Sequence, residues 1–166
     1  IDKPFNWRVS RLTEMGFGVG LWNWIDHDVD QLEKIQANYT IMNGYLVGSL
    51  ADEDGANELI KSIKDTIIIG KRLNVSRLNL HGTGLGEGGI PIKQNNNPSE
   101  KMWIKANDTL NRVCDIAEKE DVVFTLENLN LLDHPGCPFN STADVYELVS
   151  KINRPQLKIN LDLYHT

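Results

Sequence analysis

The sequence predicts an α/β fold in which a parallel sheet curves into part of a barrel. Short apolar runs alternate with longer segments of helical periodicity along the 166 residues, a pattern typical of βα units. Three of the strands are polar at alternate positions, whereas strands in an open parallel sheet are apolar on both faces. The polar faces carry Arg77, Asn79 and His81 in one strand, Thr125 and Glu127 in the next, and Lys158, Asn160 and Asp162 in the last. A polar inner face that leads to a site at the C-terminal rim is the pattern of a (β/α)8 barrel.

Five predicted strands cannot close such a barrel. A complete (β/α)8 barrel takes ~250 residues, so we expect an incomplete one here, comprising roughly strands 2 to 6 with their helices. The strands are expected at 17–24, 39–47, 75–81, 122–128 and 157–163. Gly16 supplies the turn before the first strand, and Asn43 and Gly44 interrupt the second.

Five helices are expected between and before these strands. They fall at 4–15, 30–36, 56–73, 99–119 and 145–152. Pro4 lies near the first turn of the first helix, and Ser99 is expected to cap the fourth. Ser141 and Asp144 resemble a capping box, with Asp in the usual Glu place, ahead of the last helix. Residues 1–166 are therefore interpreted as one partial barrel domain.

Composition and charge narrow the classes of function. Seventeen Lys and Arg against 23 Asp and Glu give a net charge of −6, which argues against a nucleic-acid-binding surface. No apolar run approaches the length that spans a membrane. Cys114 and Cys137 are too few for a disulfide framework, and we expect two free thiols in a protein of the cytoplasm.

Glu127 and Asp162 are the strongest candidates for chemistry. Each stands at the C-terminal end of a predicted strand, on the inward face, and the two strands are expected to be neighbours. Two like charges in a confined mouth need a cation or a shared proton, and a divalent metal is the simplest answer. In the alternative reading, both carboxylates cap the loops that follow them by accepting backbone N–H groups.

The histidines have less specific positions. His165 lies three residues after Asp162, where it could ligate a metal, bind a substrate oxygen or transfer a proton. His81 ends another strand and either contacts substrate or satisfies a loop carbonyl. His27 and His134 fall in loop-like segments, and we expect them to face solvent.

Two further patterns carry competing interpretations. Residues 84–89 satisfy G-x-G-x-x-G after a strand, but Pro91 and three consecutive Asn residues follow instead of the helix that a dinucleotide site requires. A flexible loop at the rim is favoured. Trp22 and Trp24 are expected on one face of the first strand, either as packing residues or as the wall of a pocket for a small polar substrate.

The sequence resembles the hydroxypyruvate isomerase group of the xylose isomerase-like TIM barrels, the sugar isomerase/epimerase superfamily. The residues that carry the resemblance are Phe-Thr-Leu-Glu127-Asn128, Asn-Leu-Asp162-Leu-Tyr-His165, the turn at Gly16-Phe17 leading to Trp22, and the segment from Leu78 through His81 to Gly84. It extends from about Met15 to Thr166.

The resemblance implies a role for each matching residue. Glu127 would be a metal ligand and an acid/base group, Asp162 a second metal ligand, and His165 a catalytic contact to a substrate oxygen. His81, Trp22 and Asn128 would bind substrate. The family completes its site with a ligand and a second catalytic Glu on two further strands.

The expected function is that of a metal-dependent isomerase or epimerase, an aldose–ketose type enzyme that forms an enediolate from a small hydroxycarbonyl or sugar substrate. Hydroxypyruvate is one candidate substrate. Mg²⁺ or Mn²⁺ is the expected cofactor, with Co²⁺ and Zn²⁺ as alternatives, and the fragment alone is expected to be inactive. We expect no nucleic-acid or membrane partner and leave a homo-oligomer open. The alternative functions are a non-catalytic carbohydrate-binding barrel and, less favoured because of the acidic charge and only four His, a metal-dependent apurinic endonuclease.

Overall fold

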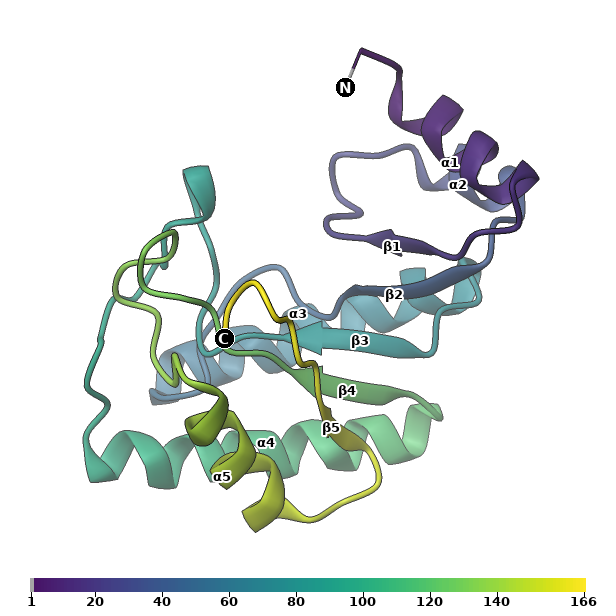
Figure 1. The fold of residues 1–166 in the computed structure, drawn as a ribbon. Helices are drawn as coiled ribbons and strands as arrows, with labels where there is room; N and C mark the ends of the chain where they lie inside the picture. The colour runs from purple at the N-terminus through teal and green to yellow at the C-terminus, as the bar shows by residue number, and fades with distance from the viewer. Residues whose placement is uncertain (1) are drawn as a thin grey trace.

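Five parallel strands form one sheet in the computed structural model, which describes residues 2–166 (Figure 1). The strands are β1 (Val19–Leu21), β2 (Tyr39–Asn43), β3 (Arg77–Leu80), β4 (Val123–Leu126) and β5 (Leu157–Ile159). Each strand pairs with the next one along the chain, in parallel. The expected α/β fold with a parallel sheet is confirmed, and the carboxyl ends of all five strands meet at one edge of the sheet.

Five α-helices accompany the sheet. They are α1 (Phe5–Glu14), α2 (Val29–Ile35), α3 (Glu53–Arg72), α4 (Glu100–Glu120) and α5 (Thr142–Ile152). Because parallel strands need a crossover, α2, α3, α4 and α5 each link two neighbouring strands. The core between α3, α4 and the sheet is closely packed, and its fully buried members include Leu59, Ile63, Leu78, Leu110 and Phe124. The other face of the strands is thus left for polar residues.

The observed strands are shorter than predicted, above all at their C-terminal ends. β4 ends at Leu126 instead of residue 128, and β5 ends at Ile159 instead of residue 163. Single backbone hydrogen bonds continue past these ends, from the Glu127 N–H to the Leu80 carbonyl and from the Asn160 N–H to the Leu126 carbonyl, both 2.9 Å. The chain therefore leaves the regular ladder just where the polar side chains begin.

The helix termini differ from the prediction in two places. α3 begins at Glu53 rather than residue 56, because the Asp52 carboxylate accepts the Gly55 N–H at 2.8 Å and caps the helix. Ser99 occupies the N-cap position of α4, but its side chain makes no capping hydrogen bond. The capping box of α5 is confirmed: the Ser141 hydroxyl and the Asp144 carboxylate each accept the other residue's N–H.

The Gly-rich segment after β3 forms a loop with one short 3₁₀ turn, η1 (Glu87–Gly89). Gly88 and Gly89 adopt positive φ angles of 65° and 78° within it. No α-helix starts in this loop, so the requirement for a dinucleotide fingerprint is not met. Cys114 and Cys137 are buried free thiols. Among residues 2–166, none of the helices combines the length and the apolar character needed to cross a bilayer.

Candidate active site

A row of polar side chains crosses the inner face of the sheet at its carboxyl edge. The Thr125 hydroxyl donates to Asn79 Oδ1 at 2.7 Å, and Asn79 Nδ2 in turn donates to Glu127 Oε2. Asn160 Nδ2 reaches the same Glu127 oxygen from the neighbouring strand at 2.9 Å. The alternation of faces predicted from the sequence brings these four residues together. Their amides fix the orientation of the Glu127 carboxylate.

Glu127 is buried, with 6% of its surface exposed, and His81 Nε2 lies 3.3 Å from its Oε2. Burial alone would raise the pKa of Glu127, but the contacts with His81, Asn160 and Asn79 outweigh it and hold the pKa below its usual value. Within residues 2–166, the side-chain hydrogen bonds to this carboxylate all reach Oε2. Oε1 is therefore the oxygen left for a ligand.

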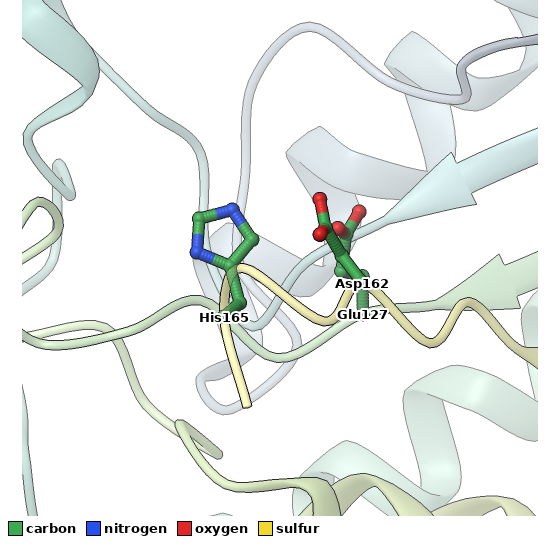
Figure 2. Close-up of side chains that lie close together, drawn as sticks. All are labelled: Glu127, Asp162 and His165. Atoms are coloured by element: carbon green, nitrogen blue, oxygen red, sulfur yellow. The ribbon is translucent and has the colours of Figure 1, made fainter.

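Asp162 and His165 approach Glu127 from the turn after β5. The His165 N–H donates to the Asp162 carbonyl at 3.1 Å, and the Tyr164 N–H donates to Asp162 Oδ1 at 2.8 Å. This turn places both side chains on the same side of the chain. Figure 2 shows the Glu127 and Asp162 carboxylates next to each other, with the His165 ring beside them.

The two carboxylates fit a divalent cation, and the His165 ring lies beside them. Each of the three side chains offers one ligand atom, and these atoms all lie within 4.8 Å of one another. Metal–oxygen distances of about 2.0–2.2 Å would let one ion reach both carboxylates after a small adjustment. Two carboxylate oxygens suit Mg²⁺ or Mn²⁺, while a carboxylate and imidazole set also suits Zn²⁺. The alternative reading, in which each carboxylate caps the loop that follows it, holds only for Asp162, whose Oδ1 accepts a backbone N–H.

His81 and Trp22 line a cavity next to this cluster. His81 is 1% exposed, and its Nδ1 lies 3.2 Å from the Tyr45 hydroxyl, which donates to the Thr83 carbonyl at 2.6 Å. The Trp22 ring lies 5.4 Å from the His81 ring, tilted by 43°, and remains 58% exposed. Trp22 and Asn43 also border the cavity that contains Glu127, Asp162 and His165. The two cavities, of about 330 and 320 Å³, thus share a wall.

The structure defines the contacts of Asn128 and corrects two other expectations. Both polar ends of the Asn128 amide contact protein, since its Nδ2 donates to the His165 carbonyl at 2.7 Å and its Oδ1 accepts from Thr142 at 3.3 Å. Asn128 therefore anchors the turn that carries His165, and its contact with substrate stays a prediction. Trp24 does not share a face with Trp22, because β1 ends at Leu21 and the Trp24 indole donates to Thr66 of α3 at 3.3 Å. His134 is half-buried and borders the cavity with Glu127, so the expectation that it faces solvent is wrong.

Local sequence patterns do not predict the contacts of these residues. His134 and Asn130 come from the loop after β4, and Tyr45 follows β2. His27, the other histidine expected in solvent, is half-buried and stacks on Phe5 with ring centroids 3.8 Å apart. Only the spatial course of the loops brings such residues to their partners.

A curved parallel sheet with carboxylates at its C-terminal rim defines the class of α/β barrels. The chain belongs to the family of xylose isomerase-like TIM barrels, whose model matches residues 12–166. The resemblance to the xylose isomerase-like TIM barrels is thereby confirmed, and the five strands are part of such a barrel.

Individual relatives agree with this assignment. The inosose isomerase of Bacillus subtilis (strain 168) is 27% identical over 125 residues, which cover 75% of this chain and 41% of that protein. An AP endonuclease, family 2, from Brucella melitensis has the same fold, with a TM-score of 0.80 and 22% identity over 99% of this chain and 65% of its own. The IOLI protein with a binding zinc atom matches with a TM-score of 0.75 and 22% identity, over 98% of this chain and 59% of its own. The chain thus spans less than two thirds of each of these relatives.

Proposed function

We propose that the protein containing this chain is a metal-dependent isomerase or epimerase of a small hydroxycarbonyl or sugar substrate. One observation carries the proposal: Glu127, Asp162 and His165 offer ligand atoms within 4.8 Å of one another at the carboxyl edge of a parallel sheet. In barrels of this kind, that edge is where catalytic residues collect. Residues 1–166 would be part of one barrel domain, in a protein of the cytoplasm, where two free thiols are expected.

The reaction requires that a proton leave a carbon next to a carbonyl, which produces an enediolate. A divalent cation held by Glu127 and Asp162 would stabilise the negative charge that develops on the substrate oxygens. Mg²⁺ or Mn²⁺ is proposed, with Co²⁺ and Zn²⁺ as alternatives. The family relative described with a binding zinc atom supports a metal in this class of site.

The residues of this chain would position the substrate and move the proton. The lowered pKa of Glu127 keeps this carboxylate ionised at neutral pH, as both metal binding and proton transfer require. A carboxylate that also holds a metal is a weak base, and a second carboxylate elsewhere in the whole protein would share the transfer. His165 would hold a substrate oxygen, and Trp22 and His81 would line the cavity around the rest of the substrate.

The substrate class follows from the cavity and from the relatives. The cavities combine polar and aromatic residues and are large enough for a compound of a few carbons. Relatives of this fold include an inosose isomerase and a D-psicose 3-epimerase. We therefore propose hydroxypyruvate, inosose and ketohexoses as the first compounds to assay.

Removal of the metal and of the Glu127 charge tests the proposal. The full-length protein would be assayed with these compounds before and after EDTA treatment, and again after Mg²⁺ or Mn²⁺ is restored. We expect EDTA to abolish turnover and the metal to restore it. Glu127→Gln should lower kcat by about 10²–10⁴-fold, the usual contribution of a positioned acid/base group. Glu147→Gln, the same change on an exposed position of α5, serves as the control.

Unchanged turnover after both EDTA treatment and Glu127→Gln would reject the proposal. Sugar binding that needs no metal and leads to no turnover would identify a carbohydrate-binding barrel. Salt-sensitive binding of abasic DNA would identify an endonuclease, which the net charge of −6 disfavours.

A further inference from the structure

Two imidazole rings, His134 and His165, lie side by side at the mouth of the cavity that contains Glu127 and Asp162. Their ring centroids are 5.4 Å apart in an edge-to-face arrangement. They come from different elements, the loop after β4 and the turn after β5. The hydrogen bonds on the far side of each ring determine which nitrogen carries the proton.

His165 is held with Nδ1 as an acceptor. The main-chain N–H of Asn130 lies 3.3 Å from this nitrogen, and the Asn130 side-chain Nδ2 lies 2.8 Å from it. The orientation of that amide is fixed, because its Oδ1 accepts the Asp133 N–H at 2.9 Å and its Nδ2 also donates to Asp133 Oδ2 at 3.1 Å. A neutral His165 ring must then carry its proton on Nε2.

His134 is held in the opposite way. Its Nδ1 lies 2.7 Å from the Gly89 carbonyl oxygen. A carbonyl oxygen can only accept, so Nδ1 carries the proton and Nε2 of the neutral ring presents a lone pair. The main chain of His134 is fixed as well, since its N–H donates to the Asn130 carbonyl at 3.1 Å. The loop after β4 and the Gly-rich loop after β3 thus set this tautomer together.

We propose that His134 and His165 form a binding site for one hydroxyl group of a polyhydroxylated substrate. A hydroxyl donates one hydrogen bond and accepts others, so it can accept from His165 Nε2–H and donate to His134 Nε2. Both rings border the same cavity, and N···O hydrogen bonds to a hydroxyl there would be about 2.8 Å long. A carbonyl, a carboxylate or a C–H group cannot satisfy both nitrogens. The pair therefore selects a hydroxyl at this position, and His134 is a specificity residue.

This inference rests on the proposed function for the substrate class, but the tautomers can be tested without any substrate. Long-range ¹H–¹⁵N spectra of the Mg²⁺-loaded full-length protein would be recorded at pH 8, where unperturbed imidazoles are neutral. We expect His134 to be protonated on Nδ1 and His165 on Nε2. His134→Gln identifies the His134 signals by their loss. The same tautomer in both rings would overturn the proposal.

The hydroxyl role is tested by binding calorimetry with D-fructose and its monodeoxy derivatives. In the wild-type protein, one derivative should bind about tenfold weaker than D-fructose, the usual effect of one lost hydrogen bond in a buried site. In His134→Phe, D-fructose itself should bind about tenfold weaker than in the wild-type protein. The affinity for that derivative should be the same in His134→Phe as in the wild-type protein. His134→Gln, which restores an acceptor oxygen, should recover part of the loss. His27→Phe, the same change at the ring stacked on Phe5, should leave binding unchanged.

The outcomes separate this inference from the proposed function. If turnover depends on metal but no derivative shows the coupling to His134, only the hydroxyl site is wrong. If the coupling is present but EDTA leaves turnover unchanged, the isomerase proposal fails and the hydroxyl site stands. If the wild-type protein binds none of these sugars, the hydroxyl site is overturned, and the EDTA and Glu127→Gln assays alone decide the isomerase proposal.

Discussion

Asn79 connects Thr125 to Glu127 and is one of two amides within residues 2–166 that hold the Glu127 carboxylate. It accepts from Thr125 on one side and donates to Glu127 on the other, at a position only 6% exposed. Because both ends of this amide are used, neither a shorter side chain nor an isosteric acid can replace it without leaving a buried group unsatisfied. The Asn79 contacts therefore serve stability and preorganisation at once.

Asn79→Asp should destabilise the protein by about 1–3 kcal/mol, the usual cost of an unsatisfied buried polar group. The new carboxylate cannot donate to Glu127 and places a second negative charge beside it. Urea unfolding of the metal-free full-length protein measures the effect. Asn111→Asp, at an exposed position of α4, is the control. Equal stability of the two variants would show that the Asn79 amide is not required.

Gly89 allows His134 to reach its carbonyl partner. A Cβ at Gly89 would lie 3.0 Å from His134 Cε1, whereas a Cβ at Gly88 would meet nothing within 4 Å. Both glycines have positive φ, so Ala at either site should cost about 1 kcal/mol through backbone strain. Only Gly89→Ala should also displace His134 and weaken D-fructose binding, by several-fold in calorimetry. If Gly88→Ala weakens binding equally, the contact with His134 is not the cause.

The residues that could be predicted from the sequence are those on regular strands. Period-two alternation correctly grouped Asn79, Thr125 and Asn160 with Glu127, because strand geometry alone decides which face they share. The partner of His134 could not be predicted, because the Gly89 carbonyl lies 45 residues away in another loop. The contacts of Asn128 with His165 and Thr142 could not be predicted either, because they depend on the turn after β5 and on the start of α5.

Among the elements, α3 shows how a single cap can respond to pH. Asp52 caps this helix and also accepts from Lys93 Nζ at 2.6 Å. Partial burial raises the pKa of Asp52, but the hydrogen bonds from Lys93 and the Gly55 N–H lower it by more. The pKa of Asp52 therefore lies below its usual value. The unfolded chain therefore takes up this proton first as the pH falls. The stability contributed by the charge is present above about pH 4 and is lost as the pH drops through the folded-state pKa.

Asp52→Asn keeps a capping oxygen but removes the charge, so it should reduce the free energy of unfolding at pH 7 and have little effect near pH 3. Asp52→Ala also removes the cap and should cost about 1 kcal/mol even at low pH. Urea unfolding at pH 7, 5 and 3 would measure both. Asp54→Asn in the same turn is the control. If Asp52→Asn reduces the free energy of unfolding equally at all three pH values, the role assigned to the ion pair between Asp52 and Lys93 is contradicted.

The type of an element could be predicted where the hydrophobic pattern repeats over a long segment, as in α3 and α4. The residues at which elements begin and end could not. The start of α3 moved to Glu53 because the Asp52 cap acts before the apolar stripe begins. β5 ended at Ile159 because the Asp162 turn, with its Tyr164 and His165 hydrogen bonds, replaces the ladder. Apolar residues beyond the strand, Leu161 and Leu163, remain 55% and 79% exposed. Local caps and turns compete with periodicity at such positions.

At the scale of the whole molecule, the curvature of the sheet turns separate strand ends into one site. Glu127 and Asp162 lie 35 residues apart in sequence, yet parallel pairing of β4 with β5 brings them together at one edge. The polar inner face of the strands already indicated this arrangement, because such a face is stable only around a solvated or liganded mouth. Loop-to-loop contacts, such as the close approach of Gly82 to the Pro138 carbonyl, depend on the assembled fold and have no sequence signature.

The central claim is that Glu127 and Asp162 share one divalent cation. A crystal of the full-length protein soaked in Mn²⁺ and measured at the manganese absorption edge tests this directly. We predict one anomalous peak within about 2 Å of an oxygen of each carboxylate, with Glu127 bound through Oε1, and loss of that peak in Asp162→Asn. The absence of an anomalous peak between these two side chains, in a crystal soaked with saturating Mn²⁺, would contradict the claim.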